Sequence, residues 1–328
     1  MISKSLKAKP FIKWVGGKTQ LIDQIDKQLP IDFDNWENVT YIEPFIGGGA
    51  MLFYMLQRYP NIERAVINDI NSDLCKCYQA VRDMPEQLIS SLRAMERNYQ
   101  NIGTEEDRKS FYMKVREHYN EKNMDVVENT TLFIFLNKTC FNGLYRVNKK
   151  GKFNVPFGKY ANPTICDAET IRLDSKLLQG VEILNGDFES TFDYAHGNTL
   201  FYFDPPYRPL SDTSSFNDYT KEAFNDNSQI RLKNYCDKIN KAGYKLMLSN
   251  SDGKGKNESD NFFDQLYSSY HIERLWASRS VNSNPQKRGK LTEILVRNYR
   301  AIKANVVREN LLFTPVAISE KNVLTRMV

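Results

Sequence analysis

The sequence predicts an α/β protein in which a mainly parallel, doubly wound sheet is interrupted by a helical and hairpin insertion. Short apolar segments of strand character alternate with helical segments over most of the 328 residues, and such alternation is typical of a parallel sheet with helices on both faces. Between residues 71 and 164 the short strand segments stop. We therefore expect one domain made of residues 1–70 and 165–303, an inserted domain at 71–164, and a C-terminal tail, 304–328, to which we assign no role.

A βαβ unit opens the first domain. The chain reads as a strand at VTYIE (39–43), a glycine turn at PFIGGGA (44–50), a helix at MLFYMLQRY (51–59) and a second strand at RAVIND (64–69). Runs rich in Val, Ile and Tyr indicate strands, and a helix is the usual crossover between parallel neighbours. Both strands therefore end at the same edge of the sheet.

The insertion begins with helices. We expect Ser72 to cap the helix SDLCKCYQAVRDM, Pro85 to begin the next helix, and Thr104 with Asp107 to form a capping box. The segment VVENTTLFIFLNK is apolar at helical spacing. Beyond it, YRVN and KFNV flank a Lys-Lys-Gly turn, which predicts a β-hairpin.

Strands return after residue 164. Four short segments are separated by helices such as SQIRLKNYCDKINKAG, and their sequences are VEILN, TLFYFD, YKLMLSN and TEILVRNY. Short buried strands that alternate with helices extend the parallel sheet begun at residue 39.

Composition excludes several classes of protein. A hydrophobic content of 41% with 26% charged residues suits a packed domain. No segment reaches the ~20 apolar residues of a membrane span, and the first residues lack a signal-peptide pattern, so we expect a soluble cytoplasmic protein without a membrane partner. Five cysteines and three scattered histidines predict reduced thiols and no metal site.

Positive charge gathers in two stretches. Residues 137–164 contain six basic side chains and no acidic one, and residues 271–303 contain eight basic against two acidic side chains. Basic stretches interleaved with aromatic residues suit a nucleic-acid backbone. The alternative is a pair of solvated surface loops.

Two strand ends suggest a nucleoside site. Gly47, Gly48 and Gly49 follow the first strand, and Asp69 ends the second strand 22 residues after Gly47. An acidic residue at this place accepts hydrogen bonds from ribose hydroxyls, but Leu52 stands where a dinucleotide fingerprint has glycine. We therefore expect an adenosine-containing cofactor held by its nucleoside. The alternatives are a simple tight turn for the glycines and a helix cap for Asp69.

The strand end LFYFDPPY carries the predicted chemistry. Asp204 ends a hydrophobic strand, Pro205 and Pro206 remove two amide donors, and Tyr207 offers a flat ring. Two oxygen acceptors beside a ring would hold an amino group on an aromatic heterocycle, such as N6 of adenine, and direct its lone pair at a methyl sulfonium. A base within a duplex would have to be flipped out to reach this site. The alternative is an incidental aspartate before a proline loop.

The order of the motifs resembles a known family, the Dam family of DNA adenine-N6 methyltransferases, which use S-adenosylmethionine. The similarity covers about residues 8 to 300 and rests on the blocks FIKWVGGKTQL, YIEPFIGGGA, AVINDINSDL, CFNGLYRVN, KFNVPFGKY, NGDF and YFDPPYRPLS. The resemblance implies a Rossmann-like methyltransferase sheet with an inserted helical and β-hairpin target-recognition domain. It also implies methylation of adenine within GATC in double-stranded DNA.

The same resemblance, with the strand-end motifs, assigns the site residues. Catalysis is expected of the DPPY residues 204–207. The cofactor would be bound by Trp14, Lys18, Glu43, Pro44, Phe45, Gly47, Gly49, Asp69, Asp187, Phe188 and Asp204. DNA would be contacted by Lys13, Phe141, Asn142, Leu144, Arg146, Pro156, Lys159 and Tyr160.

Particular roles follow for three of the expected DNA contacts. The resemblance implies that Lys13 contacts a base, that Arg146 reads a guanine and that Phe141 wedges into the duplex, which fits the usual chemistry of arginine and of apolar wedges. Phe141 replaces a tyrosine of some members. Lys159 replaces an arginine and so loses a bidentate fork. The alternative is a lysine-rich surface hairpin with a small aromatic core.

Other functions use the same acceptor pair. Cytosine N4, an RNA base or a protein glutamine offers a similar amine, and a DNA-binding relative without turnover would retain the same fold. Double-stranded DNA is the expected partner, and a separately acting restriction endonuclease is a further expected partner in the cell.

Overall fold

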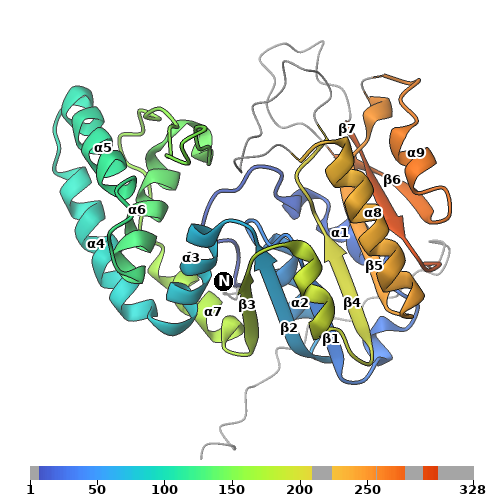
Figure 1. Cartoon of the computed structure of the whole chain (residues 1–328). Helices are drawn as coiled ribbons and strands as arrows, with labels where there is room; N and C mark the ends of the chain where they lie inside the picture. The colour runs from blue at the N-terminus through green and yellow to red at the C-terminus, as the bar shows by residue number, and fades with distance from the viewer. Residues whose placement is uncertain (1–6, 209–223, 256, 278–290, 302–328) are drawn as a thin grey trace, which may run out of the picture.

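The computed structural model describes residues 7–208, 224–255, 257–277 and 291–301 (Figure 1). The predicted tail, 304–328, and the middle of the second basic stretch lie outside these residues. Within them the strands form one seven-stranded sheet of order β3-β2-β1-β4-β5-β7-β6. The strands are β1 (Val39–Glu43), β2 (Ile62–Asp69), β3 (Val181–Asn185), β4 (Thr199–Phe203), β5 (Lys245–Ser251), β6 (His271–Ala277) and β7 (Leu291–Arg297).

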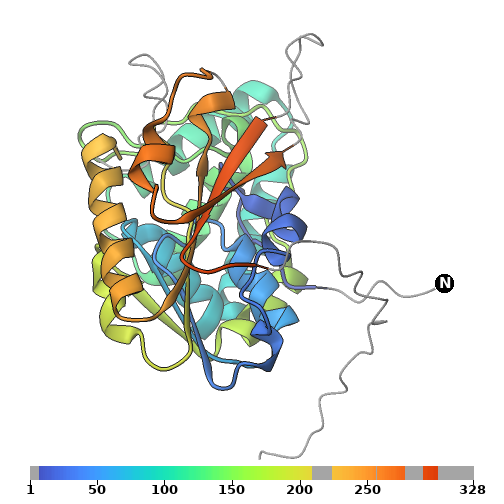
Figure 2. The same cartoon turned by 90° about the vertical axis from the view of Figure 1, so that its right-hand side faces the viewer.

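The sheet is mainly parallel, as predicted, with an antiparallel edge. β1 pairs in parallel with β2 and β4, while β2 pairs with β3 and β4 with β5. β7 is antiparallel to both β5 and β6, and Figure 2 shows this edge facing the viewer. The sequence analysis missed β6 because an edge strand with exposed His271 and Glu273 lacks the continuous apolar run of a strand buried on both faces.

Side chains of alternate residues enter two separate cores, one on each face of the sheet. Tyr41, Ile67 and Tyr202 lie in one core, and Ile42 and Phe203 lie in the other. The first face is covered by α1 (Ile22–Asp26), α2 (Ala50–Arg58), α3 (Ser72–Asp83) and α7 (Ala168–Leu178), and the second by α8 (Asp226–Lys241) and α9 (Phe262–Leu266). The sheet is therefore wound on both sides.

The inserted helices begin close to the expected places. They are α4 (Pro85–Gln100), α5 (Glu105–Tyr119) and α6 (Val126–Thr139). Pro85 is the first residue of α4, as predicted. The Thr104 hydroxyl accepts a hydrogen bond from Asp107 N, which is one of the two bonds of the predicted capping box, and donates to Asp107 Oδ2 at 2.7 Å. The predicted cap of α3 was wrong by one residue. The Asn71 side chain, not Ser72, accepts from the amides of Asp73 and Leu74, because an asparagine oxygen reaches both orphan amides.

The predicted hairpin forms as isolated antiparallel bridges instead of a regular ladder. Val147 pairs with Phe153, and Cys140 pairs with Phe157. The outward main-chain groups of Phe153 are taken by the Asn120 side chain, whose Oδ1 accepts from N at 2.7 Å and whose Nδ2 donates to O at 3.0 Å. The end of α5 therefore occupies the place of a further strand.

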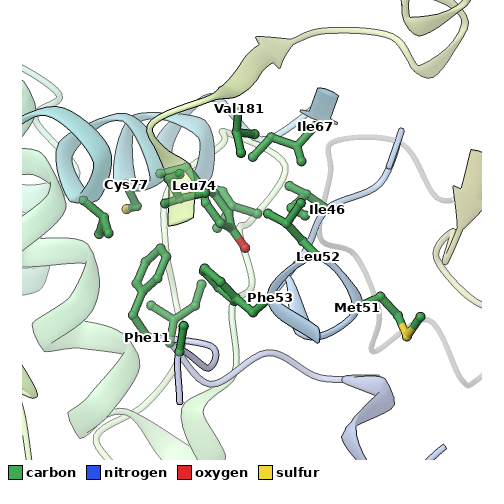
Figure 3. Packing of buried hydrophobic residues seen from close by; sticks show 14 of the residues in the cluster. Phe11, Ile46, Met51, Leu52, Phe53, Ile67, Leu74, Cys77 and Val181 are labelled. Atoms are coloured by element: carbon green, nitrogen blue, oxygen red, sulfur yellow. The ribbon is translucent and has the colours of Figure 1, made fainter. Parts of the chain in front are cut away.

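One apolar cluster joins the insertion to the sheet. Phe11 of the N-terminal segment, Phe53 of α2 and Leu74 of α3 belong to one buried cluster with Ile67 and Val181 of the sheet (Figure 3). Buried residues of α4, α5 and α6 belong to the same cluster. Figure 1 shows these three helices gathered beside the β3 edge. Since α3 packs against β2, β3 and α7 as well as α6, the domain boundary at residue 71 stays a prediction.

Candidate active site

A cavity of about 1490 Å³ opens at the carboxyl ends of the parallel strands. Its walls include the strand-end carboxyls Glu43, Asp69 and Asp204, as expected for an open α/β sheet. A single small ligand occupies ~300 to 1000 Å³, so this space admits more than one. It brings together Lys13, an expected DNA contact, and the predicted cofactor and catalytic residues, namely Trp14, Lys18, Glu43, Pro44, Phe45, Gly47, Gly49, Asp69, Asp187, Phe188, Asp204, Pro205, Pro206 and Tyr207.

The glycine turn is shaped around the indole of Trp14. A Cβ atom at Gly47 would lie 2.9 Å from ring atoms of Trp14, and one at Gly48 would lie 2.9 Å from its Cβ. Gly49 has a φ of +73°, a conformation that favours glycine. The indole also stacks on Tyr145, with ring centroids 5.7 Å apart. Trp14 therefore links the turn after β1 to the inserted hairpin.

Hydrogen bonds of the Asp69 side chain connect the end of β2 to the glycine turn. Its Oδ2 accepts from Gly47 N at 3.2 Å, and its Oδ1 accepts from Asn71 N at 2.9 Å. Burial raises the pKa of Asp69 to about 6 although these amides lower it. Since Asn71 caps α3, the cap alternative for Asp69 is excluded. The sequence analysis missed Ile70, an apolar residue that lines the cavity with 57% of its surface exposed.

A buried charge cluster surrounds Asp204. Lys18 is 3% exposed, and its Nζ lies 3.0 Å from Asp204 Oδ1 and 2.7 Å from Glu293 Oε2. It also donates to the Tyr207 hydroxyl, which donates to Glu293 Oε1 at 2.9 Å. Lys18 comes from the short 3-10 helix η1 (Lys18–Gln20) and Glu293 from β7, while Asp204 and Tyr207 lie in the loop after β4.

Burial and charge oppose each other in this cluster. Burial lowers the pKa of Lys18. The neighbouring Asp204, Tyr207 and Glu293 raise it by a larger amount, so the pKa lies well above its usual value. Burial raises the pKa of Asp204 to about 6 despite the attraction of Lys18. The sequence analysis missed Glu293, although a carboxylate within the apolar strand LTEILVR was a usable signal.

Glu43 is the last residue of β1, and its carboxyl group interacts electrostatically with Asp204. It is 2% exposed and accepts a hydrogen bond from the Tyr41 hydroxyl at 2.6 Å. Burial raises the pKa of Glu43 to about 8, the Tyr41 hydrogen bond opposes this rise, and the charge of Asp204 adds to it. The protonated form of Glu43 is therefore favoured at neutral pH.

Asp187 follows β3 and is held by an arginine that the sequence analysis missed. Arg231 of α8 donates to both carboxylate oxygens of Asp187, with Nη1 at 2.8 Å from Oδ2, and its guanidinium lies 4.6 Å from the ring centroid of Phe188. Burial alone would raise the pKa of Asp187, but the hydrogen bonds from Arg231 and Glu189 N lower it below its usual value.

The expected base-contacting residues lie around the 3-10 turn η3 (Phe141–Gly143). Phe141 is 50% exposed. The side chain of Lys13 lies against Gly143, and its Nζ is 4.9 Å from the ring centroid of Tyr160. The sequence analysis missed Asn137, whose buried amide donates to the Lys13 carbonyl at 2.8 Å and to the Gly143 carbonyl at 3.1 Å.

The other expected DNA contacts spread along the hairpin. Arg146 Nε donates to Asn154 Oδ1 at 2.8 Å, which orients its guanidinium. Leu144 is half-buried, Asn142 and Pro156 are exposed, and Pro156 O accepts from Phe141 N. Lys159 is exposed and forms an ion pair with Glu105 at 3.1 Å. It therefore faces α5, and its role in binding DNA stays a prediction.

Within the part of the chain that the structure describes, no group of three or more His, Cys, Asp or Glu side chains is placed to hold a metal ion. Among the helices described above, none combines the length and apolar character needed to cross a bilayer.

Comparisons with known proteins find a matching family and several similar proteins. Residues 14–281 match the family described as D12 class N6 adenine-specific DNA methyltransferase. The Type II methyltransferase M.MjaIII of Methanocaldococcus jannaschii is 47% identical over 297 residues, which cover 90% of this chain and 100% of the relative. The Type II methyltransferase M1.LlaDCHI of Lactococcus lactis subsp. cremoris is 39% identical over 296 residues, 89% of this chain and 95% of the relative.

A DNA adenine methylase is also among the relatives. The protein of that name from Haemophilus influenzae is 31% identical over 295 residues, which cover 90% of this chain and 95% of the relative. The resemblance to the Dam family is therefore confirmed, and the protein is an enzyme that acts on DNA. With the matched segment covering the Trp14 block, the glycine turn and the three strand ends around the cavity, the chain belongs to the D12 class of N6 adenine-specific DNA methyltransferases.

Proposed function

We propose that this enzyme transfers the methyl group of S-adenosylmethionine to N6 of an adenine flipped out of double-stranded DNA, within the sequence GATC. The observation that carries the proposal is the shared cavity, in which Asp69 and Asp204 stand at the ends of β2 and β4. One carboxylate suits a ribose and the other an exocyclic amine. The volume of about 1490 Å³ leaves room for a nucleoside cofactor and a base together.

The residues around Asp69 fit the nucleoside of S-adenosylmethionine. A ribose offers two hydroxyl donors, and a carboxylate has about four lone-pair sites, so Asp69 retains acceptor capacity beyond its two amide partners. The exposed side chain of Ile70 and the ring of Phe188 line the same space and would contact the flat base. Asp187, fixed by Arg231, would accept from the adenine amino group. When bound, the cofactor supplies a methyl group on a positively charged sulfur.

The DPPY residues would hold the target amine. The Pro206 carbonyl already accepts a hydrogen bond from Gln229 Nε2 at 3.2 Å. We therefore assign the two hydrogens of the target amine to the Asp204 carboxylate and the Pro205 carbonyl. Accepting both hydrogens draws N6 toward a tetrahedral form and exposes its lone pair. Tyr207 would stack on the base, and flipping would cost a few kcal/mol, which contacts in the cavity offset.

Sequence recognition would come from the turn η3 and the hairpin. Arg146, oriented by Asn154, would pair with a guanine in the major groove, and Phe141, half-exposed at the turn, would insert beside the target step. The name DNA adenine methylase among the relatives and the resemblance of this hairpin to that family support GATC as the site. Two relatives are named Type II methyltransferases. These names support a separately acting restriction endonuclease as a proposed partner.

Purified protein, labelled S-adenosylmethionine and plasmid DNA test the proposal. We expect label in N6-methyladenine and resistance of the plasmid to an endonuclease blocked by methylated GATC, with unchanged cutting by one indifferent to it. Duplexes with GATC replaced by GTAC serve as the matched substrate control. Absence of label would refute the proposal, and equal labelling of both duplexes would refute the GATC assignment alone.

A further inference from the structure

We propose that Glu293 is a positioning residue that holds Lys18 and Tyr207 in place while Asp204 binds the amine of the target adenine. The inference rests on the proposed function of Asp204. It assigns a role to the antiparallel edge of the sheet, because Glu293 lies on β7 and not on a parallel strand.

The first support is the charge balance of Lys18. Its ammonium is almost wholly buried, and it lies between two carboxylates, at 3.0 Å from Asp204 and 2.7 Å from Glu293. A buried cation without a partner is costly. If Asp204 were the sole charged partner of Lys18, the Lys18 ammonium would lose its counter-charge whenever the Asp204 carboxylate bound an amine. Glu293 removes this conflict, since it remains paired with Lys18 when Asp204 is used elsewhere.

The second support is the orientation of the Tyr207 ring. The Tyr207 hydroxyl donates to Glu293 Oε1 at 2.9 Å, while Lys18 uses Glu293 Oε2. The two oxygens of one carboxylate thus fix two different side chains. Lys18 Nζ also lies 4.5 Å from the Tyr207 ring centroid. The ring proposed to stack on the base is therefore held at its far end.

The third support is the rigidity of the element that carries Glu293. Glu293 pairs with Ser251 of β5 on one side and with Leu275 of β6 on the other, so its main chain lies inside the sheet. The Ser249 hydroxyl donates to Oε2 at 3.4 Å. A carboxylate on a strand that is paired on both sides keeps its place better than one on a loop.

Glu293 also affects the charge of Asp204, which gives a measurable signature. Asp204 is faced by Lys18 from η1, Glu293 from β7, Glu43 from β1, and Tyr202 and Tyr207 from its own segment. Glu293 raises the pKa of Asp204, and Lys18 lowers it. Removing the charge at 293 leaves the attraction of Lys18 unopposed, so the pKa of Asp204 falls.

The test compares Glu293→Gln with wild type in single-turnover methylation of a GATC duplex across pH. We expect the rate to fall about 10- to 100-fold, the acidic limb of the profile to move to lower pH, and the affinity for S-adenosylmethionine to stay within about threefold. Glu258→Gln, at an exposed acidic residue in the loop before α9, is the control and should match wild type.

The outcomes separate this inference from the proposed function. A wild type that methylates no DNA defeats the proposed function itself. An active wild type with an unchanged Glu293→Gln rate, or with a lower rate and an unmoved acidic limb, overturns the role of Glu293 alone. If Glu293→Gln does not fold, Glu293→Asp retains the charge at a shorter reach. Its rate should fall while the acidic limb stays in place, and an unchanged rate again overturns the inference.

Discussion

The side chain of Asn137 is hydrogen-bonded to both main-chain groups of Lys13, 124 residues earlier in the sequence. Its Oδ1 accepts from Lys13 N and its Nδ2 donates to Lys13 O, each at 2.8 Å. The same Nδ2 donates to the Gly143 carbonyl. One buried amide therefore joins the N-terminal block to the turn that carries Phe141, the residue proposed to enter the duplex.

Asn137→Ala should weaken both the fold and the reading of DNA. The change removes the three hydrogen bonds that the buried Asn137 amide makes to the main chain of Lys13 and Gly143, which costs about 1 to 3 kcal/mol of unfolding free energy. Urea denaturation measures this loss, and methylation of GATC against single-base variants measures discrimination. Asn101→Ala, an exposed position at the end of α4, is the control. Full stability together with wild-type discrimination in Asn137→Ala would contradict the assigned link.

Asp204→Asn should abolish methylation and leave the fold intact. The amide retains the shape of the carboxylate, but it replaces one acceptor oxygen by a donor that opposes the target amine. Lys18 still has Glu293 as a charged partner. We expect a single-turnover rate at least ~1000-fold below wild type, with a much smaller loss of affinity for S-adenosylmethionine by calorimetry, because the other cofactor residues are unchanged. Asp193→Asn, exposed and outside the cavity, controls for the substitution, and appreciable turnover in Asp204→Asn would remove Asp204 from the chemistry.

Asp69→Ala should reduce the affinity for S-adenosylmethionine. Loss of charge-assisted hydrogen bonds to a ribose corresponds to a ~10- to 100-fold higher Kd, measured by titration calorimetry without DNA. Asp83→Ala, an exposed acidic residue at the end of α3, should bind as wild type does. An unchanged Kd in Asp69→Ala would mean that Asp69 serves only to fasten Gly47 to β2.

Glu43 should make the protein less stable as pH rises from about 5 to about 8. Its ordinary pKa is 4.5 and its folded pKa about 8, so in this interval the folded state binds more protons than the unfolded state. The unfolding free energy therefore falls with pH, by at most about 5 kcal/mol, since one pKa unit corresponds to about 1.4 kcal/mol. Asp69 and Asp204, each with a pKa of about 6, act in the same direction at lower pH.

Glu43→Gln removes this titration and should flatten the decline above about pH 6. Urea denaturation of wild type and variant at a series of pH values gives the comparison. The variant should keep the shallower decline that Asp69 and Asp204 cause. Parallel curves for the two proteins up to about pH 8 would show that Glu43 does not retain its proton in the folded state.

Arg146→Ala should cost ~1 to 3 kcal/mol of discrimination at a single base pair. Asn154→Ala, which removes the side-chain oxygen that accepts from Arg146 Nε, should cost less at the same base pair. Rates measured on GATC and on duplexes altered at each position in turn give the comparison. An equal loss of affinity for every duplex would make Arg146 a phosphate contact.

The elements that the sequence predicted well are those with a local signal. Strands β1, β2, β4 and β5 are buried on both faces, so each reads as an apolar run, and Asp69 and Asp204 stand out because each ends such a run. The half-exposed strand β6 gives no such run. The family resemblance supplied further residues that line the cavity, such as Trp14 and Lys18, and the comparisons confirmed the family.

The residues that sequence reasoning missed depend on contacts between distant segments. Glu293 meets Lys18 across 275 positions, and Arg231 meets Asp187 across 44. Asn137 is buried within an apolar helix, where its amide carries no local pattern that reveals Lys13 as its partner. No periodicity or spacing reports such pairs, because they form only when segments distant in the sequence pack together in the fold.

The stacked rings of Trp14 and Tyr145 limit how this enzyme can be re-engineered. The indole fills the hollow made by Gly47 and Gly48 on one side and supports the hairpin on the other. If the hairpin were replaced by that of a relative with another target sequence, it would lose this support unless the N-terminal segment around Trp14 were replaced as well. Retargeting therefore calls for exchanging two distant pieces of the gene at once.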